Sequence, residues 1–307
     1  MKNIRFILIF LCLVNFSFGQ TKRDILLNEN IPSLLASNNP KDYFKAKNLL
    51  LELEETTGFL PQERFQLLND SFEHQDLSFF KKNLRILTKE YGFNLILLNK
   101  GINYYKSLTT GELSLWFRKV YPKDRAKWLR ENYEKIPYLK QLNDLAVKDQ
   151  TLAALWNRIN SITLSEESKK KIRSIFLEKT ISNFQDFLWI CKETQAYPTS
   201  KTFSLTQTPY FLVTTHMLKT PGYSMEYLKK IYPYWEEAYL SGNMDYLSFL
   251  NFDSQLFLST GKQYFGLLKT KEIPEYVLKM KGLAKEDAVP VLDEENLGQR
   301  RKNLGWD

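Results

Sequence analysis

Histidine and cysteine, the residue types that most often bind metal ions or act as nucleophiles, are scarce in this sequence. Two histidines, His74 and His216, and two cysteines, Cys12 and Cys191, are spread over 307 residues. So few residues exclude a zinc site built from several histidines or from a cysteine pair. No D-x-(D/N)-x-(D/N)-G run offers a calcium-binding loop. We therefore expect the protein to hold no metal ion and no cofactor.

Sequence motifs of well-known enzyme classes are also absent. The chain contains no HExxH, GxSxG, GxxxxGK(S/T) or GxGxxG motif. Each of these would place catalytic or phosphate-binding groups at a defined spacing. Without one of them, the sequence leaves open whether the protein is an enzyme.

Basic residues do not gather in any stretch beyond the short run 169–171. The formal net charge is +8, but Lys and Arg are interleaved with Asp and Glu, as in KDYFKAKNLLLELEE and YPKDRAKWLRENYEK. A nucleic-acid-binding surface needs clustered basic residues. We therefore expect a solvated surface of mixed charge and no nucleic-acid partner.

The first 19 residues have the pattern of a secretory signal peptide. Lys2 and Arg5 precede the apolar run Phe6–Val14, and Ser17–Gly19 is a small-x-small pattern that suits cleavage before Gln20. The apolar run is about half of the roughly 20 residues that span a bilayer, so a retained anchor is the less favoured alternative. We expect an exported protein, periplasmic or extracellular, with no transmembrane segment after cleavage.

Cleavage of that segment would remove Cys12 and leave Cys191 as the one cysteine. No intramolecular disulfide bond could then form, so a hydrophobic core alone would have to stabilise the fold. Seventeen Tyr, 21 Phe and 6 Trp supply that core, because aromatic side chains bury large areas. Cys191 itself is expected to be a buried apolar residue.

Hydrophobic periodicity predicts an all-α fold, a multi-helix bundle of one or two packed helical domains. Apolar residues recur at helical spacing, and no segment alternates convincingly as a strand does. Helix stops are predicted at Gly92 and Gly261, and Pro233 predicts a kink or break. The clearest helical patterns are residues 41–56, 76–93, 138–162 and 244–261.

The best boundary between helical regions is Pro137–Tyr138, just before the longest periodic stretch. We therefore predict a signal peptide over 1–19, an N-terminal helical region over 20–137 and a C-terminal helical domain over 138–307. Repeated helix pairs within residues 25–135 remain an alternative.

Polar residues follow one another through the second half in a recognisable order. The order comprises the pair DQ at 149–150, a helix that begins with Asn183, an apolar run that ends in His216, the turn GKQYFG at 261–266 and the terminal RRKNLG at 300–305. This order resembles a bacterial family, the domain of unknown function 6624. The resemblance covers about residues 140–307 and implies no particular reaction. It singles out Asp149, Gln150, His216, Gln263, Gly266 and Arg301.

The sequence departs from the pattern of that family in its turn and in the helix before it. Phe265, Leu267 and Leu268 stand where the family has a tyrosine, a small polar residue and a glutamine. Its Asp-Arg pair is reduced to Asp253-Ser254, one residue out of step. These departures put in doubt any chemistry that the family resemblance would imply.

Three residues are candidates for catalysis: His216, Asp149 and Arg301. His216 would act as a general base, with Asp149 as its carboxylate partner and Arg301 as a clamp for an anion. The alternative is structural. His216 would then be a neutral histidine at a helix end, and Asp149 would pair with Arg300 or Arg301, because a buried charge is costly without a partner.

Gln150, Gln263 and Arg300 are the candidates for binding. Tyr264 and Phe265 are expected to pack inside their turn, and Gly261 and Gly266 to adopt positive φ angles. His74 is expected in a solvent-facing loop. With no strong catalytic motif, we favour a binding or interaction protein for a protein, peptide or small-molecule partner over a hydrolase-like enzyme.

Overall fold

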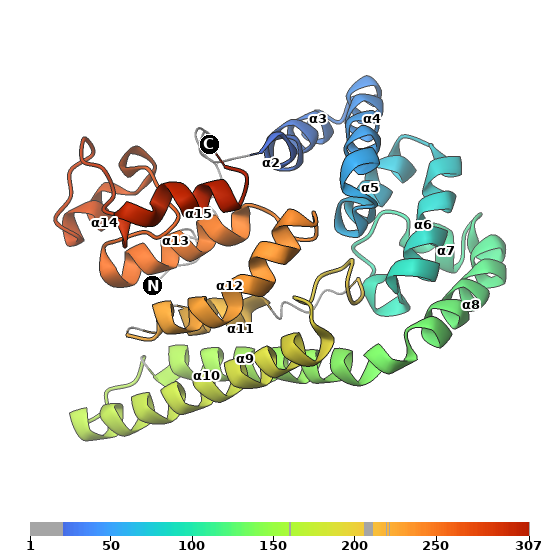
Figure 1. Cartoon of the computed structure of the whole chain (residues 1–307). Helices are drawn as coiled ribbons and strands as arrows, with labels where there is room; N and C mark the ends of the chain where they lie inside the picture. Colours follow the sequence, from blue (N-terminus) through green and yellow to red (C-terminus); the bar gives the residue numbers. More distant parts are fainter. Residues whose placement is uncertain (1–20, 160, 206–210, 219, 221, 307) are drawn as a thin grey trace. The chain divides into compact units, whose positions relative to one another are not determined.

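The computed structural model describes residues 21–159, 161–205, 211–218, 220 and 222–306, and helices dominate all of them (Figure 1). Among these residues no strand forms; a single parallel bridge joins Gln263 and Val291. The all-α prediction is confirmed. The predicted signal peptide and Cys12 lie outside the described residues. None of the described helices is long and apolar enough to cross a membrane.

The chain divides into two compact units. One, the N-terminal unit, consists of residues Leu26–Thr214 and Ser241–Asn243. The other, the C-terminal unit, consists of Thr215–Leu240 and Met244–Asp307 together with the segment that ends at Ile25. This division differs from the predicted boundary at Pro137–Tyr138, which falls within the first turn of a helix of the N-terminal unit.

The helices of the N-terminal unit follow one another with short connections. Their bounds are η1 Leu26–Asn30, α3 Ile31–Ala36, α4 Pro40–Thr57, α5 Pro61–Glu73, α6 Leu77–Tyr91, η2 Leu95–Leu97, α7 Tyr105–Thr109, α8 Ser114–Glu131, η3 Tyr133–Lys135, α9 Ile136–Ile159 and α10 Glu166–Thr194. Helix α11, Phe211–Leu218, straddles the division between the units.

Helix α6 shows how local sequence sets these bounds. The Asp76 side chain accepts a hydrogen bond from the backbone N–H of Phe79, which caps the helix start. Gly92 ends the helix in the left-handed conformation with φ 72°, as predicted. One face of α6 is buried in a core that includes Phe80, Leu84 and Tyr104. Burial of this apolar face, more than helix propensity, stabilises the helix.

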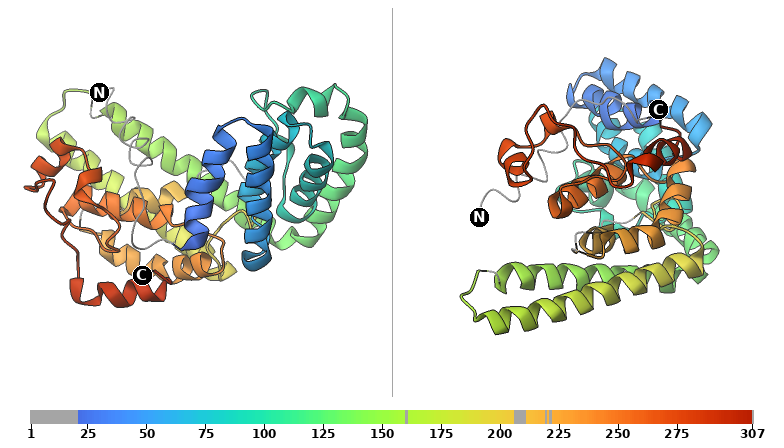
Figure 2. Two further views of the ribbon diagram at one scale, coloured as in Figure 1. Left: turned by 90° about the horizontal axis from the view of Figure 1, so that it is seen from above. Right: turned by 60° about the vertical axis from the view of Figure 1, so that its left-hand side comes forward.

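Helices α9 and α10 form a long antiparallel hairpin (Figures 1 and 2). Ser165 caps α10 by accepting a hydrogen bond from the backbone N–H of Ser168. Pro137 is the second residue of α9, a position in the first turn where proline is tolerated because its N–H would be unbonded anyway. The proline therefore opens a helix rather than separating two domains.

The C-terminal unit is built around an aromatic core. Its helices are α2 Lys22–Ile25, α12 Ser224–Leu240, α13 Leu247–Thr260, η4 Thr270–Glu272, α14 Glu275–Met280, η5 Glu294–Asn296 and α15 Leu297–Asn303. The Phe249 ring lies 5.7 Å from Trp235, 5.1 Å from Phe265 and 5.2 Å from Trp306. Edge-to-face contacts of this kind add to the burial of the rings.

Helix α12 continues through Pro233, so the predicted break is wrong. A proline inside a helix removes one backbone hydrogen bond. The apolar face of α12 nevertheless runs on across the proline, because Ile231, Trp235 and Tyr239 are all buried. Packing of this face holds both halves of the segment in one helix.

Candidate functional site

The turn GKQYFG lies directly after α13 and is held by Asp253. The carboxylate of Asp253 accepts hydrogen bonds from the backbone N–H groups of Tyr264 at 2.7 Å, Phe265 at 2.9 Å and Leu267 at 3.0 Å. The Asp253 side chain is fully buried, and burial raises its pKa to about 6 although the three hydrogen bonds act to lower it. Its oxygens are occupied by the backbone, so Asp253 shapes the turn.

Gln263, a candidate for binding, is also part of this framework. Its Oε1 accepts from the backbone N–H of Leu268 at 2.7 Å. Its Nε2 donates to the carbonyl groups of Leu268 at 3.3 Å and Val289 at 3.1 Å. The amide is buried and makes these bonds within the protein, so a structural role accounts for it.

Gly261 and Gly266 have φ angles of 77° and 73°, as predicted. A Cβ atom at Gly266 would lie 3.2 Å from Leu297 Cδ1. The carbonyl oxygen of Gly266 accepts a hydrogen bond from Arg301 Nη1 at 3.4 Å. Phe265 is fully buried and Tyr264 is half-buried, so the expected packing of the turn is confirmed.

Arg300 on α15 contacts the GKQYFG turn. Its Nη1 forms an ion pair with Asp293 at 2.9 Å, and its Nη2 donates to the carbonyl groups of Tyr264 and Leu292, each at 3.0 Å. Its guanidinium lies 4.1 Å from the Tyr264 ring centre. Arg300 thus has a carboxylate partner in Asp293, seven residues earlier, and the pairing of Asp149 with Arg300 or Arg301 stays a prediction.

The three candidate catalytic residues lie on three helices of two different units. Asp149 is buried on α9 of the N-terminal unit, and the Gln150 side chain donates to it at 3.3 Å. His216 lies half-buried on α11 and Arg301 lies on α15, both in the C-terminal unit. The hydrolase-like constellation of these residues stays a prediction.

Cys191 and His74, the two other residues of a chemically reactive type, are packed against the core of the N-terminal unit or against a neighbouring ring. Cys191 is fully buried, and burial raises the pKa of its thiol far above the usual range, so the thiol stays protonated. The expectation of a buried apolar cysteine is confirmed. His74 ends α5 and stacks on Tyr43 with ring centres 4.9 Å apart. It lies in the turn between α5 and α6, as predicted, but it is half-buried rather than fully solvent-facing.

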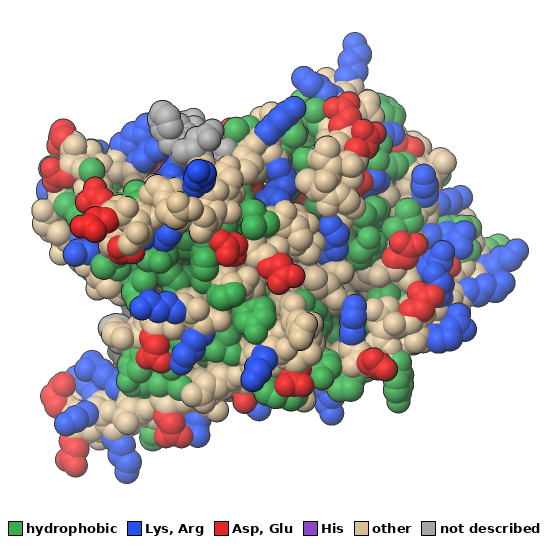
Figure 3. Space-filling view, viewed as in Figure 1, with side chains coloured by type: hydrophobic (Ala, Val, Ile, Leu, Met, Phe, Trp, Pro, Cys, Tyr) green, Lys and Arg blue, Asp and Glu red, His purple; other side chains and the backbone are tan. Residues whose placement is uncertain are grey.

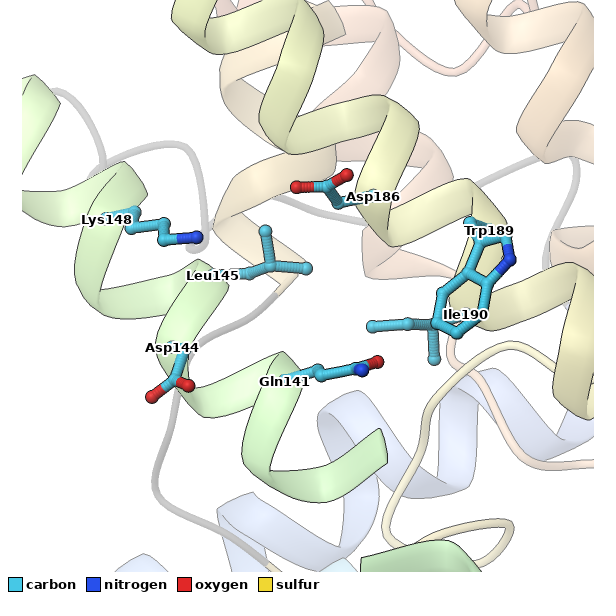
Figure 4. Close-up of a pocket in the computed structure, with 7 residues that line it drawn as sticks. All are labelled: Gln141, Asp144, Leu145, Lys148, Asp186, Trp189 and Ile190. Carbon is cyan, nitrogen blue, oxygen red and sulfur yellow. The ribbon is translucent and has the colours of Figure 1, made fainter. Parts of the chain in front are cut away.

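A pocket of about 280 Å³ lies between α9 and α10 (Figure 4). Leu145 and Ile190 form its buried floor, and the Trp189 side chain at its rim is 47 % exposed. Figure 4 shows Lys148 and Asp186 pointing into the gap from opposite helices. The full lining is Gln141, Asp144, Leu145, Lys148, Asp186, Trp189 and Ile190.

The charged groups of this pocket are not engaged in the fold. Asp144, Lys148 and Asp186 form no hydrogen bond or ion pair with any residue that the structure describes. The Trp189 ring has one aromatic neighbour nearby, Tyr138, at 6.0 Å between ring centres. The pocket therefore offers one aromatic ring, an apolar floor and charged groups free to meet a ligand.

Sequence reasoning missed this pocket. Asp186 is not among the predicted candidates, and Trp189 is one of the six tryptophans that are expected to form an aromatic core. A signal was present, because Asp186, Trp189 and Glu193 recur at helical spacing on one face of α10. Such a stripe combines a large aromatic side chain with acidic neighbours on a face that should be solvated.

Two other hollows are less informative. One, of about 190 Å³, lies near the tip of the hairpin and is lined by Trp156, Ile159, Ile162, Lys169, Ile172 and Arg173. The other, of about 520 Å³, lies beside the GKQYFG turn and mixes three lysines with three acidic residues. Gln263 lines this second hollow, but its amide is already engaged by the backbone.

The described residues contain no group of three or more His, Cys, Asp and Glu that would suit a metal ion. On the face in Figure 3, basic and acidic side chains are interleaved, without a continuous area of either sign. No family model, no curated protein and no solved structure matches the chain. Its function must therefore be argued from its own site.

Proposed function

We propose that this chain is an exported helical interaction protein that binds a peptide segment of a partner at the pocket between α9 and α10. The observation that carries the proposal is Trp189, a large aromatic side chain left 47 % exposed at the rim of a pocket. Tryptophan is among the residues that most often dominate the binding energy of protein interfaces. Its burial by a partner would remove a large apolar area from water.

The size of the pocket is compatible with a peptide side chain as its occupant. Its volume of about 280 Å³ lies at the lower limit of the roughly 300–1,000 Å³ that is usual for drug-sized ligands. A hollow of this size suits one long side chain, with the rest of the ligand lying along the helices. Recognition through a few anchoring side chains is common when a peptide binds a helical surface.

The exposed apolar side chains of the hairpin support the same role. Several large side chains on α9, on α10 and in their connection remain open to solvent. They are Val147, Leu155, Ile162, Ile175 and Trp189. The polar residues around the GKQYFG turn are less suited to bind a ligand, because Asp253, Gln263 and Arg300 already form hydrogen bonds or ion pairs within the C-terminal unit.

Export and family membership are part of the proposal. Export is supported by the apolar run Phe6–Val14 and the small-x-small pattern Ser17–Gly19. The resemblance to the domain of unknown function 6624 remains a prediction. Fractionation of the producing cells, with N-terminal sequencing of the released protein, tests cleavage before Gln20.

Selection of displayed random 12-residue peptides on residues 20–307 tests the binding role. We expect selected peptides to lose at least tenfold in affinity against Trp189→Ala, about 1.4 kcal/mol or more. Leu115→Ala is the control, because Leu115 lies on α8, away from the hairpin, and is 81 % exposed. Failure to enrich any peptide, or equal binding to both variants, would contradict the proposal.

A further inference from the structure

We infer that the pocket between α9 and α10 takes a cationic side chain, that of a lysine or arginine in the bound peptide. This inference rests on the proposed peptide-binding function and names the chemistry of the residue that is recognised. The cation would lie between the Trp189 ring and the Asp186 carboxylate, with its aliphatic stem on the floor made by Leu145 and Ile190.

The first support is the placement of Asp186 and Trp189. They are three residues apart on α10, a spacing that makes side chains neighbours on a helix surface. Figure 4 shows the Asp186 carboxylate directed into the gap between the two helices, on the side of α10 that carries Trp189. A cation within about 6 Å of an aromatic ring is attracted to the ring face, and here a carboxylate stands beside that ring.

The second support is the balance of charge around the gap. Asp144 and Asp186 line the pocket, and neither forms an ion pair with a described residue. Lys148 is the one cation that lines the pocket, so carboxylates outnumber ammonium groups there.

The third support is the mixed character of the lining. Lysine and arginine present an aliphatic stem and a charged head, and the pocket offers a matching pair of surfaces. Leu145 and Ile190 are buried apolar side chains, whereas Asp186 is exposed at the mouth. An anionic side chain would instead meet the carboxylate of Asp186, and a neutral apolar one would desolvate that carboxylate without compensation.

Lys148 gives the inference a distinctive consequence. Its ammonium group points into the same gap from α9 and makes no ion pair with a described residue (Figure 4). It therefore repels an incoming cation. Removal of its charge by Lys148→Gln should strengthen the binding of a cationic ligand, whereas Asp186→Asn should weaken it.

Three capped amino acids serve as probes: Nα-acetyl-lysine methylamide, its norleucine analogue and its glutamate analogue. Binding is followed by the indole N–H signal of Trp189 in an NMR spectrum, assigned with Trp189→Phe. We expect the lysine probe to bind about three- to fivefold more tightly than norleucine, in line with an exposed cation–π contact. The glutamate probe should bind most weakly.

The variants decide between electrostatic recognition and simple packing. Asp186→Asn should bring the affinities of the lysine and norleucine probes to within about twofold of each other. Lys148→Gln should widen the difference, because the charges of Asp186 and Lys148 act on the lysine probe and not on norleucine. Glu167→Gln is the control, because Glu167 is an exposed carboxylate of α10 outside the pocket. It should change the affinity of neither the lysine nor the norleucine probe. Circular dichroism confirms that each variant is folded.

The possible outcomes distinguish a failure of the cationic preference from a failure of the proposed peptide-binding function. If norleucine binds as tightly as lysine, or glutamate binds more tightly, the cationic preference is wrong while peptide binding at Trp189 stands. If none of the probes shifts the Trp189 signal and peptide selection also fails, both are wrong. If selected peptides bind at Trp189 but lack enriched lysine and arginine, the inference alone is wrong.

Discussion

Trp306 donates its indole N–H to the phenol oxygen of Tyr239 at 2.8 Å, and the two rings meet edge to face with centres 5.7 Å apart. The same phenol donates its own proton to the carboxylate of Asp24 at 2.5 Å. Arg23 adds a hydrogen bond to the Tyr239 carbonyl oxygen at 2.8 Å. Tyr239 thus joins the first described residues of the chain to Trp306, three residues after the end of α15, within the C-terminal unit.

Tyr239→Phe is therefore expected to destabilise the C-terminal unit by about 2–4 kcal/mol. The phenylalanine ring keeps the packing but leaves the Trp306 N–H without its acceptor and removes a donor to Asp24, and each such loss in a buried site costs roughly 1–3 kcal/mol. Urea unfolding, localised by amide hydrogen exchange and mass spectrometry, measures the change. Tyr276→Phe, at an exposed residue, should cost less than about 0.5 kcal/mol.

Asp253→Asn is expected to loosen the turn at residues 261–266. Asparagine has nearly the same shape, but one oxygen becomes an NH₂ group that faces backbone N–H donors. Repulsion between donors, with at least one backbone N–H left unbonded, should lower the free energy of unfolding by about 1–3 kcal/mol. Faster amide exchange at Tyr264, Phe265 and Leu267 would confirm it, and unchanged exchange there would contradict it.

The stability of the C-terminal unit should depend on pH through the titration of Asp253. Burial raises its pKa from 3.8 to about 6, so between these values the folded state binds more protons than the unfolded state. Stability from this group is therefore largest below about pH 4, falls as pH rises to about 6, and is constant above that. The difference in unfolding free energy between wild type and Asp253→Asn should change by about 3 kcal/mol across this window. A difference that does not depend on pH would contradict a raised pKa of Asp253.

Local elements were predictable from the sequence because their signals are local. The apolar spacing of α4, α6 and α13, and the helix ends at Gly92 and Gly261, follow from periodicity and backbone preference. The division into units was not predictable. It depends on a short N-terminal segment whose Asp24 accepts a hydrogen bond from Tyr239, 215 residues later in the chain. No periodic pattern in the sequence predicts such a contact.

The candidate residues of the second half show the same limit. Gln263 and Arg300, both binding candidates, gather at one turn with Gly266, but the polar contacts of these residues serve the fold. The exposure of Trp189 was missed because a helical pattern does not tell which side of α10 stays uncovered. That outcome is decided by the packing of α9 against α10 and not by either helix alone.

Gly92→Ala provides the sharpest test of the N-terminal unit. Gly92 has φ 72°, and a Cβ atom there would lie 2.8 Å from the Trp128 ring and 2.3 Å from Ser204 Oγ. A left-handed conformation costs alanine about 1–2 kcal/mol, and overpacking against the buried tryptophan adds about 1–3 kcal/mol. We therefore expect Gly92→Ala to lower the unfolding free energy by about 2–5 kcal/mol. Gly282→Ala isolates the conformational part, because Gly282 has φ 69° with no atom within 4 Å of the added Cβ. It should cost only about 1–2 kcal/mol, and equal losses in the two variants would show that Trp128 does not press on this turn.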